Sequence, residues 1–199
     1  MNELGHTIRQ RRIALGLALE ALAKRTGVSR AMLSDIERGV KNPTIKVLSQ
    51  IAEGLGCTVS YLLGEQLGDP GESIHILRKH ERRVLVDPQS GVERQVLAPV
   101  LQRHGIEVVW YVIPPGQKTG SFPPHQHGVE EHITLVQGRL ECTLGDRNIV
   151  LETEDSVSFP ADVTHDFSNP GPLPCQYFLI IDSSHKDEPL TFLHGYPQW

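Results

Sequence analysis

Residues 120–138 read GSFPPHQHGVEEHITLVQG and contain a dense group of side chains able to bind a metal. His125 and His127 are two residues apart, and Glu131 follows four residues after His127. Residues two apart on an extended strand point to the same face, so both imidazoles are expected on one side of a sheet. The spacing therefore predicts a ligand cluster carried by a strand.

A second stretch, residues 159–169 with the sequence FPADVTHDFSN, adds His165. Together the two stretches follow His-x-His-x3-Glu-x6-Gly and Pro-x4-His-x3-Asn, which resembles the two signature motifs of the cupin family. The resemblance implies a double-stranded β-barrel that holds a metal near its axis. By the same resemblance, the metal ligands are His125, His127, Glu131 and His165.

Three imidazoles and one carboxylate suit a divalent transition metal such as Zn, Fe, Mn or Ni, with positions left open for water or an effector. A cupin whose polar cluster is hydrogen-bonded or filled with water fits the same residues, and both readings stay open. An effector pocket needs an apolar wall beside such polar groups. We expect that wall to include Ile133, Leu135, Cys142 and Phe167. Cys142 is either a redox-sensitive thiol or inert core.

The chain around these motifs shows the short alternating segments of an all-β domain. Arg82–Val86 is a strand candidate, followed by the turn sequence of Asp87–Gly91. Ile106–Ile113 is apolar on both faces apart from Glu107, which fits a strand buried on both sides. Many short strands at this spacing favour a jelly-roll or cupin barrel over a parallel sheet.

The bulk composition is that of a soluble globular protein, with 199 residues, 39% hydrophobic and 22% charged. No apolar run is long enough for a membrane span, and the N-terminus does not resemble a secretory signal. Three widely spaced cysteines argue against a disulfide framework and for the cytoplasm.

The net charge of −5 is unevenly distributed along the chain. Residues 1–66 contain nine Lys and Arg against six Asp and Glu, and residues 67–199 contain ten against eighteen. The first segment is therefore +3 and the second −8. A basic N-terminal segment suggests that any contact with nucleic acid is made there.

Residues 1–66 show helical periodicity. Gly16, Gly27 and Gly39 each follow a candidate helix, and Ser29 has the character of an N-cap. Helices are expected at 3–15, 19–25, 29–37, from about Thr44 onward, and at about 59–63.

Two short helices joined by a turn with Gly27, inside a unit of this size, indicate a helix-turn-helix. Residues 6–64 resemble the Xre/Cro-type domain of phage repressors, carried by the run GVS at 27–29, IERG at 36–39 and the pair Asn42-Pro43. The resemblance makes Ser29–Glu37 the recognition helix, with Met32 and Leu33 expected in the core.

Carried over by position, the DNA-binding residues are Ser29, Arg30, Ala31, Ser34, Asp35, Arg38, Lys41 and Asn42. Arg30 is the best candidate for reading bases, because a guanidinium can grip the two acceptors of guanine in the major groove. The carboxylate of Asp35 either accepts a hydrogen bond from cytosine or excludes wrong bases. Lys41 and Asn42 are placed to hold phosphate.

The expected fold class is α+β multidomain: a five-helix helix-turn-helix domain at 1–66, a Gly-, Pro- and acid-rich linker at 67–75, and a cupin domain at 76–199. The two domains together resemble the Xre–cupin class of prokaryotic regulators, usually repressors. A single helix-turn-helix contacts too few bases for a unique site, so we expect a homodimer that binds a palindromic operator in double-stranded DNA. A metal or a small-molecule effector in the cupin domain would modulate operator binding.

Two other functions remain open at this point. A cupin metalloenzyme, similar to non-haem iron oxygenases or epoxidases, would use the same ligand cluster and carry the helical domain as an accessory. A non-catalytic binding or storage module would leave the basic first domain without a role. The spacing identifies no separate acid–base pair that favours the enzyme.

Overall fold

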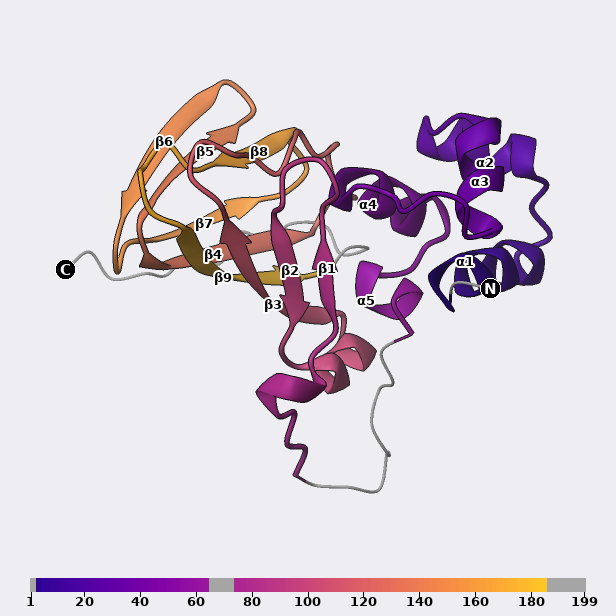
Figure 1. Cartoon of the computed structure of the whole chain (residues 1–199), viewed down its shortest axis with the longest axis horizontal. Helices are drawn as coiled ribbons and strands as arrows, with labels where there is room; N and C mark the ends of the chain where they lie inside the picture. The colour runs from indigo at the N-terminus through magenta and orange to yellow at the C-terminus, as the bar shows by residue number, and fades with distance from the viewer. Residues whose placement is uncertain (1–2, 65–73, 186–199) are drawn as a thin grey trace.

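The computed structural model describes residues 3–64 and 74–185, and its N-terminal part is the expected five-helix domain (Figure 1). Three of the helices begin at a hydroxyl N-cap, because Ser29, Thr44 and Thr58 each accept a hydrogen bond from a backbone N–H three residues on. The helices are α1 (Glu3–Ala14), α2 (Leu19–Thr26), α3 (Arg30–Glu37), α4 (Ile45–Gly54) and α5 (Val59–Leu62). None of the helices in the described ranges is long and apolar enough to cross a bilayer.

The helical domain is closed by one apolar core and one buried ion pair. The core residues are Ile8, Leu22, Val28, Leu33, Ile36, Leu48, Ile51, Ala52, Leu55, Val59 and Leu62. The Arg12 guanidinium donates to both carboxylate oxygens of Glu37, at 2.6 and 2.8 Å, and ties α1 to α3. Leu33 is buried as predicted, but the prediction for Met32 is wrong: the helical step from one residue to the next turns Met32 to the exposed side of α3.

The second domain is the predicted all-β barrel, built from two antiparallel sheets. One sheet has the strand order β1-β2-β3-β9-β4-β7, and the other has the order β6-β5-β8. The strands are β1 (Val84–Val86), β2 (Glu93–Val96), β3 (Ile106–Ile113), β4 (Glu130–Gln137), β5 (Arg139–Leu144), β6 (Arg147–Glu152), β7 (Ser156–Pro160), β8 (His165–Ser168) and β9 (Cys175–Asp182), with short 3-10 helices at Lys79–Glu81 and Pro99–His104. Most of the predicted linker at 67–75 lies outside the described residues.

Strands β3 and β9 form the centre of the larger sheet and pair over their full length. Every second side chain of β3 is buried, as expected for alternation across a barrel wall. The rings of Tyr111 and Tyr177 stack inside, with centroids 5.2 Å apart. On the other face, Trp110 meets Phe178 edge to face at 4.7 Å.

The two domains share an interface at the start of α4, which lies next to the β1–β2 hairpin (Figure 1). Ile45, the first residue of α4, is buried in the hydrophobic core of the barrel and not in that of its own domain. Its backbone N–H donates to Asp87 Oδ2 at 3.0 Å, while Asp87 Oδ1 accepts from the N–H groups of Gln89 and Ser90. The turn of the barrel hairpin therefore caps a helix of the other domain.

The Asp87 carboxylate is stabilised by these three donors. Burial by itself raises the pKa of Asp87, but the hydrogen bonds from the backbones of Ser90, Gln89 and Ile45 outweigh burial and lower it. A lowered pKa means that the contribution of Asp87 to stability is present above the pKa of an unfolded Asp, about 3.9. That contribution is lost as the pH falls through the folded-state pKa.

We predict that Asp87→Ala lowers the free energy of unfolding at neutral pH by about 1–3 kcal/mol, because buried backbone donors lose their acceptor. The difference from wild type should shrink as the pH falls below about 4. Urea unfolding followed by circular dichroism at several pH values measures it. Asp146→Asn in the exposed β5–β6 turn is the control, and an equal effect of both changes at neutral pH would contradict the cap.

Candidate functional site

Three of the four predicted ligands come together at one mouth of the barrel. His125 lies in the segment before β4, Glu131 lies in β4 and His165 begins β8. His125 Nε2 is 3.3 Å from Glu131 Oε1, and His165 Nε2 is 3.6 Å from the same oxygen. One ligand atom from each of the three residues lies within 4.8 Å of the others.

The cluster fits a divalent transition metal by its geometry. Metal–ligand bonds of about 2.0–2.2 Å in a tetrahedral site separate the ligand atoms by about 3.3–3.6 Å, as found around Glu131. His165 Nδ1 donates to the Val163 carbonyl oxygen at 2.9 Å, which leaves the lone pair of Nε2 directed at the cluster. Glu131 Oε2 is buried and has no hydrogen-bond partner among the described residues, so the cluster contains one carboxylate oxygen that accepts no hydrogen bond there.

The environment of His125 favours its charged form. Burial lowers the pKa of His125, but the hydrogen bond that its ring donates to Glu131 and the charges of Glu131, Glu53 and Glu107 outweigh burial and raise it. The carboxylates around the His125 ring therefore favour a positive charge at that position. A bound cation can replace the proton in that field.

His127 does not join the cluster. The expectation that His125 and His127 share a strand face is wrong, because the segment before β4 is not a strand and turns at His127 and Gly128. Gly128 has a φ of 85°, which the turn requires. The His127 side chain is 60% exposed, and its Nδ1 lies 3.0 Å from Asp162 Oδ2. We find the fourth predicted ligand paired outside the barrel mouth.

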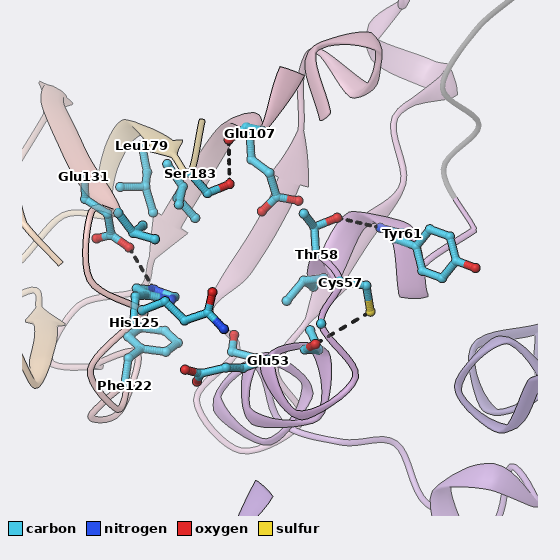
Figure 2. A pocket seen from close by; sticks show the side chains of 18 of the residues that line it. Glu53, Cys57, Thr58, Tyr61, Glu107, Phe122, His125, Glu131, Leu179 and Ser183 are labelled. Carbon is cyan, nitrogen blue, oxygen red and sulfur yellow. Dashed lines mark hydrogen bonds and ion pairs between the residues drawn. The ribbon is translucent and has the colours of Figure 1, made fainter. Parts of the chain in front are cut away.

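A cavity of about 700 Å³ opens beside the cluster (Figure 2). Of the four residues expected in its apolar wall, Phe167 lines it. Ile133, Leu135 and Cys142 do not line it, because they are buried in the barrel core. Burial raises the pKa of Cys142 to about 12, so the thiol stays protonated and is inert core.

Sequence reasoning missed that the helical domain forms one wall of the cavity. Ser49 and Glu53 of α4, and Thr58 and Tyr61 around α5, line it opposite the barrel. The sequence motifs do not predict this wall, because the wall forms only where the two domains meet. Figure 2 shows Glu53 at the cavity floor near His125.

Glu107 was visible in the sequence as the one charge in an apolar strand, but its role was not predicted. It is 5% exposed and accepts a hydrogen bond at 2.9 Å from Arg94, which is equally enclosed. A charged pair inside a barrel loses its hydration, and each partner compensates the charge of the other.

The predicted DNA-binding residues lie at the start of α3, on α3 and directly after it, and we call this set the α3 edge. Ser29, Arg30, Ala31, Arg38, Lys41 and Asn42 are exposed, while Ser34 and Asp35 are half-buried. Arg30 pairs with Glu20 of α2 at 2.7 Å. Asp35 is held by Arg38 at 2.7 Å and by Lys41 at 3.7 Å, so acidic neighbours partly neutralise the cations of this edge.

Comparison with known families matches both domains. A helix-turn-helix family model matches residues 8–62, and a cupin domain model matches residues 109–181. The helix-turn-helix match covers α2 and α3, and the cupin match covers His125, Glu131 and His165.

Several known proteins align with nearly the whole chain. The HTH-type transcriptional regulator SutR of Escherichia coli K12 is 29% identical over 182 residues, which are 89% of this chain and 93% of SutR. The HTH-type transcriptional regulator PuuR of the same organism is 24% identical over 178 residues, 89% of this chain and 90% of PuuR. The crystal structure of an HTH_3 family transcriptional regulator from Vibrio cholerae superposes with a TM-score of 0.75, at 25% identity, over 98% of this chain and 96% of that one.

Proposed function

Because the chain belongs to the helix-turn-helix transcriptional regulators that carry a cupin domain, we propose that it represses transcription by binding a palindromic operator. In this proposal the recognition helix α3 enters the major groove of double-stranded DNA. The observation that carries the proposal is the exposed edge that begins at the N-terminus of α3 and continues through Lys41 and Asn42. We expect such a protein to act in the cytoplasm.

The ion pairs on this edge are weak enough to exchange for DNA. Exposed pairs contribute about 0–1 kcal/mol each, and the pair of Arg30 with Glu20 has both side chains exposed. Guanine acceptors or phosphates replace Glu20 at little expense of free energy, whereas a wrong base leaves Arg30 with its acidic neighbour. The pair with Glu20 therefore does not prevent Arg30 from contacting DNA.

We predict that selection from a random DNA pool by the full chain enriches a short two-fold symmetric motif. Arg30→Ala should weaken binding to that motif by about 1–3 kcal/mol, because one base contact is lost. Fluorescence anisotropy at two salt concentrations measures it. Arg147→Ala, an equal change of charge on the exposed strand β6, should leave affinity unchanged. Enrichment of no motif, or equal losses in both variants, would contradict the proposal.

We propose that the outer face of the larger sheet holds two copies together. This face carries Trp110 and Phe178 in edge-to-face contact, and Phe178 is 37% exposed. Val84, Val86 and Val136 lie exposed on other strands of the same sheet. Exposure of such an apolar face to water is unfavourable, and a second copy would cover it. A two-fold dimer also supplies the second recognition helix that a palindromic operator needs.

Phe178→Glu should convert the dimer to monomers, because a charge would be buried in the dimer interface. Sedimentation velocity measures the molecular mass, and operator affinity should fall in parallel. Leu173→Glu introduces the same charge in an exposed loop before β9 and is the control. A Phe178→Glu protein of unchanged mass would contradict this interface.

We propose that His125, Glu131 and His165 hold a divalent transition metal, with Zn, Fe, Mn and Ni all compatible. The distances around Glu131 and its spare buried oxygen support this site. The bound metal would supply a Lewis-acidic point at the cavity wall. The residues of the chain supply the rest: His165 is oriented by the Val163 carbonyl, and Phe122 packs against its ring at 5.4 Å.

The metal proposal predicts about one ion per chain after incubation with Zn²⁺ and desalting. His125→Ala and His165→Ala should lose the ion, because each removes one of three ligands. His127→Ala should keep it, since His127 lies outside the cluster. Elemental analysis by mass spectrometry measures the content. If His127→Ala lost the metal as fully as His125→Ala, the three-residue site would be wrong.

We further propose that the cupin domain binds its effector without converting it, since the relatives that span the chain are regulators. The cluster of three possible metal ligands beside a cavity also fits the alternative of a non-haem iron oxygenase. Oxygen consumption by the iron-loaded chain distinguishes the two. Turnover abolished in His165→Ala would establish the enzyme.

A further inference from the structure

Strand β1 lies at the edge of the larger sheet, and one of its faces is covered by the helical domain. It is the first strand in the order β1-β2-β3-β9-β4-β7, and Figure 1 shows it beside α4 and α5. Val84 and Val86 are 49% and 51% exposed, whereas Leu85 is half-buried and Asp87 is buried. Side chains two residues apart share a face of an extended strand, so Leu85 and its flanking residues Arg83 and Asp87 are expected on one face.

The first contact of this face with the helical domain is made by Arg83. Its guanidinium donates to the carbonyl oxygen of Leu63, directly after α5. It also donates to both carboxylate oxygens of Glu3 in α1, at 3.2 and 3.4 Å. The pair with Glu3 is exposed and screened by water, so it orients the two domains more than it stabilises them. One side chain of the barrel therefore holds the end of α5 and the start of α1.

The next two contacts follow at intervals of two residues along the chain. Leu85 packs against the hydrophobic core of the barrel and also against that of the helical domain. Asp87 accepts a hydrogen bond from the backbone N–H of Ile45, at 3.0 Å, and Ile45 itself is buried in the barrel core. An apolar contact thus lies between two polar contacts on one face of β1.

The three contacts hold the helical domain against rotation. They extend over about 13 Å, because a strand advances about 3.3 Å per residue, and their polar members reach α1, α5 and α4. A single contact would let the domain pivot, whereas three separated contacts fix its orientation. The α3 edge shares this orientation, since Arg12 of α1 binds Glu37 at the end of α3.

The opposite face of β1 belongs to the proposed dimer interface. Val84 and Val86 lie there, on the same sheet as Trp110 and Phe178. One strand therefore separates the surface at which two copies would meet from the domain that would read DNA. In both copies the helical domain is held at the same place on β1. The distance and the rotation between the two recognition helices then follow from how the barrels pair.

We propose that Arg83, Leu85 and Asp87 are positioning residues for operator recognition, which fix the separation of the two recognition helices and thereby the number of base pairs between half-sites. This inference rests on the proposed function, because only a dimer on a palindromic operator has half-sites to separate. None of the three residues needs to touch DNA. They affect the spacing of the half-sites and not the bases read within one half-site.

The spacing of half-sites is a strict criterion on B-DNA. One turn contains about 10–10.5 base pairs, so two added base pairs rotate one half-site by about 70° relative to the other. They also move it by about 7 Å along the axis. Recognition helices held rigidly cannot follow this displacement, so one half-site loses its contacts. Recognition helices on freely rotating domains can follow it.

The first test needs no DNA. Backbone amide relaxation, measured by NMR on the full-length protein, should give one rotational correlation time for both domains of the wild type. In the triple variant Arg83→Ala, Leu85→Ala and Asp87→Asn, the helical domain should lose this common value and tumble faster than the barrel. Asparagine at 87 keeps an oxygen for the hairpin turn and loses the second acceptor that Ile45 uses.

A matched control makes the same three changes at exposed positions of the barrel. It combines Asp146→Asn, Arg147→Ala and Leu173→Ala, and both domains should keep one correlation time. Circular dichroism checks that each variant folds. Because Leu85 also packs in the barrel, the double variant Arg83→Ala and Asp87→Asn replaces the triple variant if the triple variant does not fold.

The second test measures the affinity of the full-length protein for a series of operators. The half-sites found by selection are placed at the selected spacing and with one, two or three base pairs added. Wild type should lose about tenfold or more in affinity when two base pairs are added, whereas the triple variant should lose less than about threefold. Both proteins should bind an isolated half-site equally, because the α3 edge is unchanged. A merely destabilised protein would bind both kinds of DNA more weakly.

Several results would overturn the proposal. Wild-type domains that tumble independently, or a triple variant whose domains still tumble together, would show that β1 does not hold the helical domain. Independent tumbling in the triple variant with an unchanged preference for one spacing would remove the role in operator recognition. If no motif is enriched, that role fails together with the proposed function, and the relaxation measurement still decides whether β1 holds the helical domain.

Discussion

The structure depends on the hydrogen bond between Asp87 and the first N–H of α4. A helix start must find acceptors for its free N–H groups, and α4 takes one acceptor from its own chain neighbourhood and one from the barrel. Ile45 at the same point is buried in the barrel core. The two domains are consequently joined at Ile45 by a polar contact and an apolar contact. Helix α4 therefore packs in the helical domain and against the barrel.

This contact between the domains determines where the cavity beside the His125, Glu131 and His165 cluster forms. A barrel alone has an open mouth at His125 and His165, where water would screen the charges of Glu107 and Glu131. With α4 and α5 set against it, the mouth becomes a bounded cavity in which the same charges act at lower dielectric. The domain contact thus strengthens electrostatic recognition in the barrel.

The sequence was sufficient for the five helices and the short strands of the barrel, because hydrophobic period and caps are local properties. The resemblance to the cupin motifs, and not the spacing alone, identified the residues of the cluster. It was misleading for His127, since two-residue spacing places side chains together only on a strand, and here the chain turns. It was silent on Glu53, whose place in the cavity depends on how α4 meets the barrel. Ile133 and Leu135 have the alternation expected of pocket residues, but strand alternation cannot distinguish a cavity wall from packed core.

The same limit applies to the DNA-binding edge, where position in the motif identifies Arg30 but not its neighbours. Glu20 comes from the preceding helix, and Asp35 holds Arg38 and Lys41 from within the edge itself. An edge of free cations would bind any duplex through its phosphates. Here Glu20 pairs with Arg30, and the single carboxylate of Asp35 is shared by Arg38 and Lys41. Exposed pairs of this kind contribute only about 0–1 kcal/mol each, so they reduce the positive charge of the edge without blocking its contacts. In a chain with a net charge of −5, acidic partners beside the cations of this edge lower its unspecific attraction for phosphates.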